Sequence, residues 1–296
     1  MKVDSMKMEE FFKTCSEGTP REIEEALENN PDIDINELEN YENWTYDSHD
    51  DIFANIISTT GKVTALMVAA AKNPEPEAVA VLLENGADIN QSSSYGKTAL
   101  MLAALYNPNT DNLLLLLKNG ANLDKSDHSG NSALMMAAFN NSNAEALTIL
   151  LKNGADINEK NIRGNTAFMM AALHNPNPEV LAFLLENGAD MTAPDEIPIW
   201  CFTLMNPNPE VFALLLKNGL DINAEGLNGK TALMLATSEE KANPDVIPLL
   251  LQYGADPHRK DKAGKRAIDY ARENDKIKNT EIFKELLKAS RIAINR

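Results

Sequence analysis

The sequence predicts an all-α solenoid, in which short helical hairpins stack on one another along the chain. Two observations support this fold class. First, several apolar runs, such as VLLEN or ALLLKN, are each followed by a glycine. A short segment rich in Ala and Met, and then a joint rich in Asn and Pro, often precede the run. Second, these glycines are spaced by 34, 34, 34, 31 and 35 residues: Gly86, Gly120, Gly154, Gly188, Gly219 and Gly254. Such a period is the signature of a stacked repeat array.

Residues 165–192 show how one repeat is built. Thr166 opens a first helix whose Ala-Ala pair allows a neighbouring helix to approach closely. In the joint, Asn177 is the expected N-cap of the second helix, and Pro178 is its first residue, where a missing N–H costs nothing. Gly188 ends the second helix in the left-handed conformation. That helix is too apolar to stand alone in water, so we expect it to be buried by stacking.

These residues resemble the consensus of the ankyrin-repeat family, which runs G-x-T-P-L-H-x-A-A, then a joint, then V-V-x-L-L-L-x-x-G-A-D-V-N. The sequence has GKTALMLAA at 96–104, GNSALMMAA at 130–138, GNTAFMMAA at 164–172, GKTALMLAT at 229–237, and NGADIN at 85–90 and 153–158. The resemblance spans almost the whole chain. It implies an ankyrin-repeat solenoid of about eight repeats including caps, with β-hairpin turn tips between the helical hairpins.

Two departures from the family recur. Ala-Leu-Met replaces Pro-Leu-His, so the hydrogen-bonding His of the motif is absent. We expect methionines to fill its place by packing: Met67, Met101, Met135, Met169 and Met234. The joint is one residue longer than the consensus, which explains a period of 34. The TALMxAA variant and the NPNPEV joints are more similar to bacterial members of the family than to animal ones.

The repeat favours a single elongated domain over the two domains that 296 residues would suggest. Residues 1–36 are an N-terminal capping repeat, 37–60 an insertion, 61–192 four regular repeats, 193–223 a short degenerate repeat, 224–257 a further repeat and 258–296 a C-terminal capping repeat. In the first cap, Pro20 lies just inside the second helix, and Asn30 takes the place that Gly has in later repeats.

The insertion is the largest departure from the regular pattern. Asn36 and Thr64 are 28 residues apart, whereas Asn90 and Thr98 are 8 apart. Residues 37–60 mix aromatic with many acidic residues, and a connection of this length is either functional or disordered. The aromatic content favours a flap that packs over the first repeats.

Two further stretches predict local packing. The run LLLLL at 113–117 indicates a helix buried on both sides, so Leu115→Ala would cost ~2–5 kcal/mol if Leu115 is core. The short repeat lacks most of its hairpin tip and carries bulky residues at the Ala-Ala position, so we expect a local change in curvature. There Trp200 either lines the notch left by the missing tip or is a core residue.

Charge excludes some partners. The net charge of −17 disfavours nucleic acid and anionic membranes, because both require clustered Lys and Arg. Residues 1–60 hold 16 acidic and 4 basic residues, and residues 258–296 hold 6 and 12, so the chain is an electric dipole. The N-terminal stretch does not read as a signal peptide, and no stretch is long enough to span a membrane. We expect a cytoplasmic monomer, with export into a host cell by a non-classical route as the alternative.

The sequence shows no motif for catalysis or cofactor binding. It has no GxGxxG, GxxxxGK, GxSxG or HExxH, so we expect no enzyme activity and no cofactor. An acidic cluster with one histidine lacks the Gly and the terminal Glu of a calcium loop, which disfavours a metal there: Asp47, His49, Asp50 and Asp51. Cys15 and Cys201 lie in different repeats, which disfavours a disulfide and a cysteine zinc site.

The resemblance implies that the chain binds a partner protein or peptide on a concave face built from the tips and the exposed side of the first helices. The matching positions are those around each tip glycine and the two that follow the Ala-Ala pair. They include Tyr95, Lys97, Tyr106, His128, Phe139, Asn140, Arg163, His174 and Met205, with Trp200 at the notch. Aromatic residues and Arg are common interface anchors. Phe139 also fits a role in packing between repeats.

The main hypothesis is therefore a non-catalytic scaffold or adaptor. One alternative is an inhibitory or regulatory subunit of an enzyme, in which the acidic first 60 residues mimic an anionic substrate. Another is a bacterial effector directed at a host. An enzyme or metal protein that uses the insertion has the least support.

Overall fold

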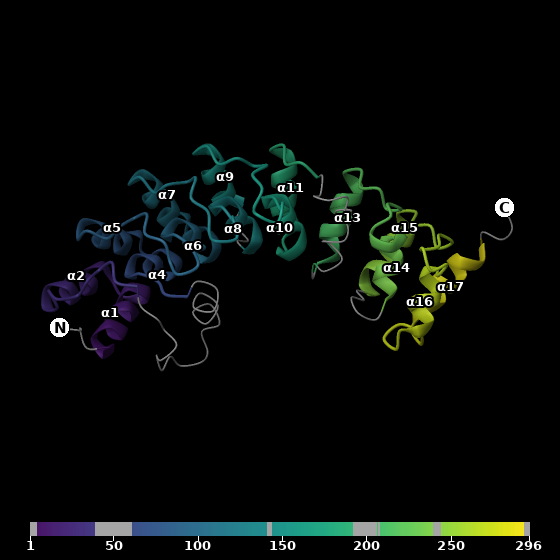
Figure 1. Ribbon diagram of the computed structural model, residues 1–296, viewed down its shortest axis with the longest axis horizontal. Coiled ribbons are helices and arrows are strands. Elements are labelled where there is room, and N and C mark those ends of the chain that lie inside the picture. Colours follow the sequence, from purple (N-terminus) through teal and green to yellow (C-terminus); the bar gives the residue numbers. More distant parts are fainter. Residues whose placement is uncertain are drawn as a thin grey trace. The chain divides into compact units, whose positions relative to one another are not determined.

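The computed structural model describes residues 5–38, 61–140, 144–191, 206, 208–238 and 244–292. Within these ranges it has 15 α-helices, two short 3₁₀ helices and no strand longer than one isolated bridge residue. The chain divides into two compact units, Met1–Ala167 and Phe168–Arg296. Each unit is built of stacked helical hairpins (Figure 1), which confirms the predicted all-α repeat fold.

In the first unit, the first helices of successive repeats pack on one another, and so do the second helices, which gives two layers. The first helices are α1 (Ser5–Glu17), α4 (Ala65–Lys72), α6 (Ala99–Tyr106) and α8 (Ala133–Asn140). The second helices are α2 (Pro20–Asn29), α5 (Pro76–Glu84), α7 (Thr110–Lys118) and α9 (Ala144–Lys152). Helices α1 and α2 form the first hairpin, and α2 begins at Pro20, the residue expected just inside the second helix.

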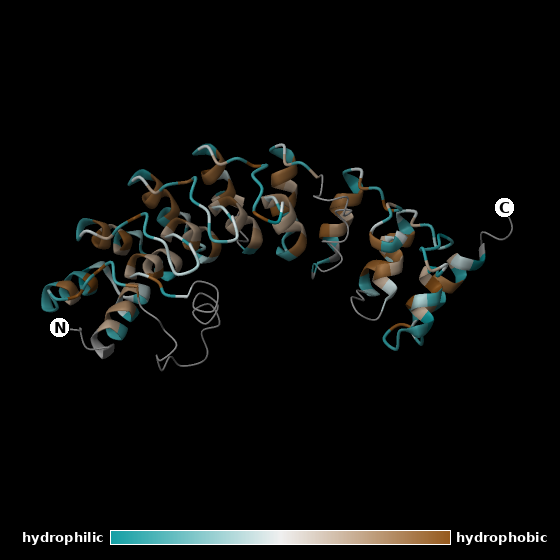
Figure 2. Cartoon of the chain, in the orientation of Figure 1, coloured by the Kyte–Doolittle hydropathy of each residue, from teal (hydrophilic) through white to brown (hydrophobic). Residues whose placement is uncertain are grey.

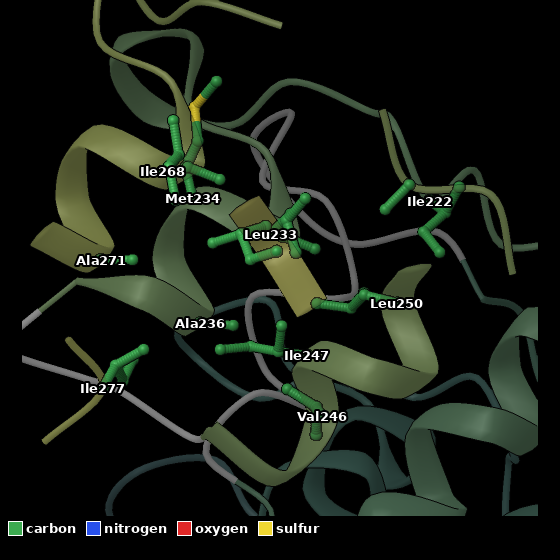
Figure 3. Packing of buried hydrophobic residues seen from close by; sticks show 14 of the residues in the cluster. Ile222, Leu233, Met234, Ala236, Val246, Ile247, Leu250, Ile268, Ala271 and Ile277 are labelled. Atoms are coloured by element: carbon green, nitrogen blue, oxygen red, sulfur yellow. The ribbon is translucent and has the colours of Figure 1, made fainter. Parts of the chain in front are cut away.

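The second unit continues the same alternation of first and second helices. Its helices are α10 (Ala167–His174), α11 (Pro178–Glu186), α13 (Pro209–Lys217), η3 (Leu227–Gly229), α14 (Ala232–Thr237), η4 (Pro244–Val246), α15 (Ile247–Gln252), α16 (Ala267–Glu273) and α17 (Glu281–Ile292). In this unit α11 packs on α13, α14 on α16, and α15 on α17. Side chains from α14, α15 and α16 meet in one apolar cluster (Figure 3), which joins the last two hairpins.

The first helices α4, α6 and α8 are short and apolar on almost every side, so each needs cover from both neighbours. In α6, every residue from Ala99 to Leu105 is buried. Figure 2 shows the hydrophobic residues along the helices and hydrophilic ones in many of the loops at their ends. The methionines expected to replace the motif histidine are all at most 1% exposed, which confirms their packing role: Met67, Met101, Met135, Met169 and Met234.

Helix α11 begins and ends as the sequence predicts. Asn177 is the N-cap of α11, where its side chain accepts a hydrogen bond of 3.0 Å from the N–H of Glu179, and Pro178 is the first helical residue. Gly188 follows the helix with a φ of +89°. A helix end of this kind needs a left-handed residue, and Gly adopts that conformation without a Cβ clash.

The leucine run of α7 is buried along one side only. Leu113 and Leu116 are at most 2% exposed, whereas Leu115 is partly exposed. The prediction that the whole run is buried on both sides is therefore wrong, because the second helices form the outer layer and keep one face toward solvent. Leu116 is the position at which the full cost of a core cavity applies.

Buried asparagines in the joints tie each repeat to the one before it. The side-chain amide of Asn107 donates to the carbonyl oxygens of Ala70 (2.9 Å) and Asn73 (3.1 Å), and its Oδ1 accepts from the N–H of Asn109 (2.9 Å). Asn107 is 3% exposed. The same pattern of a buried amide bonded to the preceding repeat recurs at Asn73, Asn206 and Asn274. These bonds satisfy carbonyl groups that the ends of the first helices would otherwise leave unpaired.

A second set of asparagines links the loops that follow the second helices. Asn90 donates to the carbonyl of Gly120 (3.4 Å) and accepts from the N–H of Asn122 (2.7 Å). Asn36 makes the equivalent bonds, to Gly86 (3.1 Å) and from the N–H of Asp88 (2.7 Å). The first and second repeats are therefore joined in the same way as the second and third, although the insertion separates them in sequence. The insertion predicted to form a flap spans 37–60, and its residues 39–60 lie outside the described residues.

Candidate protein-binding surface

The tips between repeats are closed by a polar side chain and turned by a glycine. Asp127 Oδ1 accepts hydrogen bonds from the N–H groups of Ser129 (2.9 Å) and Asn131 (2.8 Å). Gly130 then reverses the chain at a φ of +76°. Asn161 closes the next tip with the same pair of bonds. A short side chain that bonds its own turn in this way fixes the loop before any partner arrives.

Backbone hydrogen bonds join neighbouring tips of the first unit into a row. They run from Ser94 N–H to Lys62 O (3.1 Å), from His128 N–H to Tyr95 O (3.0 Å), and from Ile162 N–H to Ser129 O (3.1 Å). The tips approach so closely that a Cβ built on Gly130 would lie 2.8 Å from the nitrogen of Ile162. The predicted β-hairpin tips are thus turns in the described residues, and one main-chain bond joins each tip to the next. Side chains add a second bond at two of these links: Ser94 Oγ accepts from the N–H of Lys62 (3.2 Å), and Asn161 Nδ2 donates to Asn131 Oδ1 (2.7 Å).

This row carries the large exposed side chains of the first unit. Tyr95 is 51% exposed and Ile162 is 75% exposed. His128 and Arg163, two of the predicted contact residues, are also exposed on the same tips. An apolar side chain, two aromatic or imidazole rings and a guanidinium therefore project from a fixed backbone, which is the composition of an interface anchor region.

Lys97, another predicted contact residue, is buried next to the tip and is not part of the exposed row. It is 7% exposed, and burial lowers the pKa of its ammonium group, while the nearby Asp127 carboxylate acts in the opposite direction. Its side chain offers a partner little surface, so we assign it to support of the tip. The sequence does not distinguish this position from an exposed one, because a lysine after the tip glycine fits both.

The predicted residues on the first helices are less uniform. Tyr106 and Phe139 are half-buried, and Asn140 is exposed and donates to the carbonyl of Leu105 at 3.3 Å. His174 is exposed in the second unit, and partial burial lowers the pKa of its imidazole. Trp200 and Met205 fall within 192–205, outside the described residues.

Two exposed apolar residues occupy tip positions that the resemblance selects for partner contact: Ile162 and Leu227. Ile162 and Leu227 each lie two residues before a tip glycine, and Leu227 is 79% exposed. Their position relative to Gly164 and Gly229 is the signal that identifies them. An apolar residue in an otherwise polar turn has no structural role unless it packs, and these two side chains remain largely in solvent.

In the part of the chain that the structure describes, no three His, Cys, Asp or Glu side chains form a group that could hold a metal ion. The acidic cluster around His49 lies outside that part. No described helix is both long and apolar enough to cross a membrane. Cys15 is buried, which raises the pKa of its thiol well above the ordinary range.

A family model described as "Ankyrin repeats (3 copies)" matches residues 23–127, 109–195 and 200–296. Among solved structures, the chain is similar to the human ASB11 ankyrin repeat domain, with a TM-score of 0.64 and 23% sequence identity. That match covers 77% of this chain and 98% of the other. A likeness at this identity supports the fold alone. A comparison with curated proteins returned no match.

Proposed function

Because the chain belongs to the ankyrin-repeat family, we propose that it is a non-catalytic scaffold or adaptor that binds a partner protein through its row of tips. Ankyrin repeats are generally protein–protein interaction modules. The observation that carries the proposal is the tip row of the first unit, where main-chain bonds fix the turns and Tyr95 and Ile162 stand exposed. The half-buried Tyr106 and Phe139 extend this surface onto the first helices.

Preorganisation is the physical argument for binding at this row. Ordering a mobile loop at an interface costs free energy, and a turn that is already closed and bonded to its neighbours avoids that cost. The side chains that anchor interfaces are large and partly apolar, as Tyr95 and Ile162 are. No feature of the described residues favours the inhibitory-subunit alternative.

Affinity capture from the native cell, followed by mass spectrometry, tests the proposal. We expect the double variant Tyr95→Ser and Ile162→Ser to lose the partner that the unaltered chain captures, because both anchors are removed while the main-chain bonds remain. The control is Lys118→Ser with Lys152→Ser, which alters two exposed residues at the ends of α7 and α9. Retention of the partner by the tip variant would place the binding site elsewhere. The control variant should retain the partner.

A further inference from the structure

The two last tips of the second unit, around Gly229 and Gly264, form a surface that is apolar at one edge and basic elsewhere. Leu227, on the first of them, is 79% exposed. The next residue, Asn228, is left-handed at a φ of +60°, and its carbonyl accepts from the N–H of Lys262 on the second tip (2.9 Å). The two tips are therefore held side by side as in the first unit, with an apolar side chain at the edge of the pair.

The second of these tips is strongly basic. Its sequence at 259–266 is RKDKAGKR, with five basic residues and one acidic residue. The acidic residue, Asp261, is 7% exposed and faces inward. Its carboxylate accepts from the N–H groups of Ala263 and Lys265 (2.9 Å each) and from the hydroxyl of Tyr270 (2.5 Å). The carboxylate is thus committed to the turn itself.

These hydrogen bonds also determine the protonation states of Asp261 and Tyr270. Burial alone would raise the pKa of Asp261, but the hydrogen bonds from Tyr270, Lys265 and Ala263, with the charge of Lys230, hold it below its usual value. Burial and the bond to Asp261 raise the pKa of Tyr270 to about 12. At neutral pH the arrangement is a carboxylate bonded by a neutral phenol.

The ring of Tyr270, on α16, holds two ammonium groups on this surface. Lys230 Nζ lies 4.5 Å and Lys265 Nζ 5.1 Å from the ring centroid, which is within the range of cation–π attraction. Lys265 also bonds both oxygens of Glu273, at 2.8 and 2.9 Å. Among the described residues, no carboxylate lies within ion-pair distance of Lys230, Lys260 or Lys262. The charges of the exposed Lys260 and Lys262 are therefore available to a partner, and Lys230, which also acts on Tyr270 and Asp261, adds to the positive charge of the same surface.

We propose that these residues, which we call the basic tip patch (Leu227, Lys230, Lys260 and Lys262), bind an acidic segment of a partner protein that also carries an apolar side chain. The proposal rests on the proposed function and names the chemistry of the partner. Charge complementarity selects the acidic segment, and Leu227 gives it an apolar anchor. A protein segment fits better than nucleic acid, because the patch is short and because the exposed Leu227 offers a phosphate backbone no favourable contact.

The charge around the patch adds to the attraction. Residues 258–296 hold 12 basic and 6 acidic residues, so this part of the second unit attracts an acidic partner. The long-range part of this attraction is screened by salt over about 8 Å at physiological ionic strength. The contact at the patch itself is screened less where Lys230 is half-buried against Tyr270.

The test is a fluorescence-anisotropy titration of the full chain with a labelled peptide of Glu and Asp residues around one central Leu. We expect saturable binding that weakens about tenfold or more in the triple variant Lys230→Gln, Lys260→Gln, Lys262→Gln, because together the three substitutions remove the positive charge of the basic tip patch. Leu227→Ser should weaken it further. The charge-matched control, Lys118→Gln, Lys152→Gln, Lys217→Gln, removes exposed lysines at the ends of second helices and should stay within about twofold.

Three results would overturn the proposal: no saturable binding, an equal loss in both triple variants, or equally tight binding of a single-stranded oligonucleotide of the same charge. Cooperative thermal unfolding of every variant, measured alongside, verifies that the fold is intact. The outcome is separate from that of the tip-row capture, because Lys230 and its neighbours lie in the other compact unit from Tyr95 and Ile162. Loss of the patch with a functional tip row leaves the proposed function in place.

Discussion

At the scale of single residues, the asparagines of the joints have two roles, of which the sequence indicates only one. In the joints, the pattern Asn-Pro predicts an N-cap, and Asn177 confirms it. The buried Asn two residues earlier bonds carbonyl groups about one repeat away, as Asn107 does with Ala70. A sequence shows which residue can cap the helix that follows it, but the distant acceptor becomes visible only when the repeats are stacked.

Asn107→Asp should destabilise the first unit by ~2–4 kcal/mol at neutral pH. The change removes the two donated hydrogen bonds and places a carboxylate against the carbonyl oxygens of Ala70 and Asn73. Urea unfolding followed by circular dichroism measures the loss. Acidification should recover part of it, because a protonated carboxyl group donates one hydrogen bond.

The control for this variant is Asn122→Asp. Asn122 is exposed, and its side chain accepts from the N–H of Asp124 (2.9 Å), a bond that a carboxylate also accepts. The equivalent position is already Asp in the neighbouring repeats, at Asp88 and Asp156. An equal loss of stability in the two variants would show that added negative charge, and not the buried amide, is responsible.

At the scale of elements, the tips depend on close approach as well as on turn geometry. Gly130 has a positive φ, and a Cβ there would lie 2.8 Å from the nitrogen of Ile162 on the next tip. Gly120, after α7, also has a positive φ of +87°, but a Cβ there would meet nothing within 4 Å. A comparison of substitutions at these two glycines therefore distinguishes the cost of backbone strain from the cost of a clash between tips.

Gly130→Ala should cost ~1–3 kcal/mol more than Gly120→Ala, because both incur the left-handed penalty and only the first forces neighbouring tips apart. Urea unfolding of the two variants gives this difference directly. Hydrogen exchange should show the loss of protection at the N–H of Ile162 in the first variant only. Equal stabilities would mean that the row adjusts to a methyl group without strain.

The helices of this fold follow from the sequence more fully than its surface does. The ends of α11 follow from local chemistry, because Pro178 fixes φ, Asn177 caps an N–H group and Gly188 adopts the left-handed conformation. The continuous apolar sequence of α6 requires burial on all sides. Burial of Lys97 and exposure of Leu227 do not follow from local chemistry. Both depend on how one tip lies against the next, which the sequence of a single repeat does not specify.

At the scale of the whole molecule, the insertion is separate from the joint between the first two repeats. Asn36 reaches Gly86 and Asp88 as Asn90 reaches Gly120 and Asn122. Asn73, in the joint of the second repeat, also donates to the carbonyls of Cys15 (3.1 Å) and Gly18 (2.9 Å) in the first. The bonds between these repeats therefore involve described residues on both sides of 39–60.

Replacement of 39–60 by Gly-Ser should leave the first unit folded, because it restores between Asn36 and Thr64 the spacing of 8 that separates Asn90 from Thr98. The urea midpoint should change little. Loss of hydrogen-exchange protection in α1 and α2 would contradict this expectation. Partner capture with the shortened chain then shows whether the insertion takes part in recognition.

The main-chain bonds between tips determine which substitutions the surface of this chain tolerates. Every residue type except proline supplies the N–H and C=O groups that hold Tyr95, His128, Ser129 and Ile162 in their row. Substitutions among the outward side chains therefore leave the spacing of the row unaltered. The surface can acquire new recognition properties one position at a time, so a library randomised at these positions would vary affinity on a constant framework.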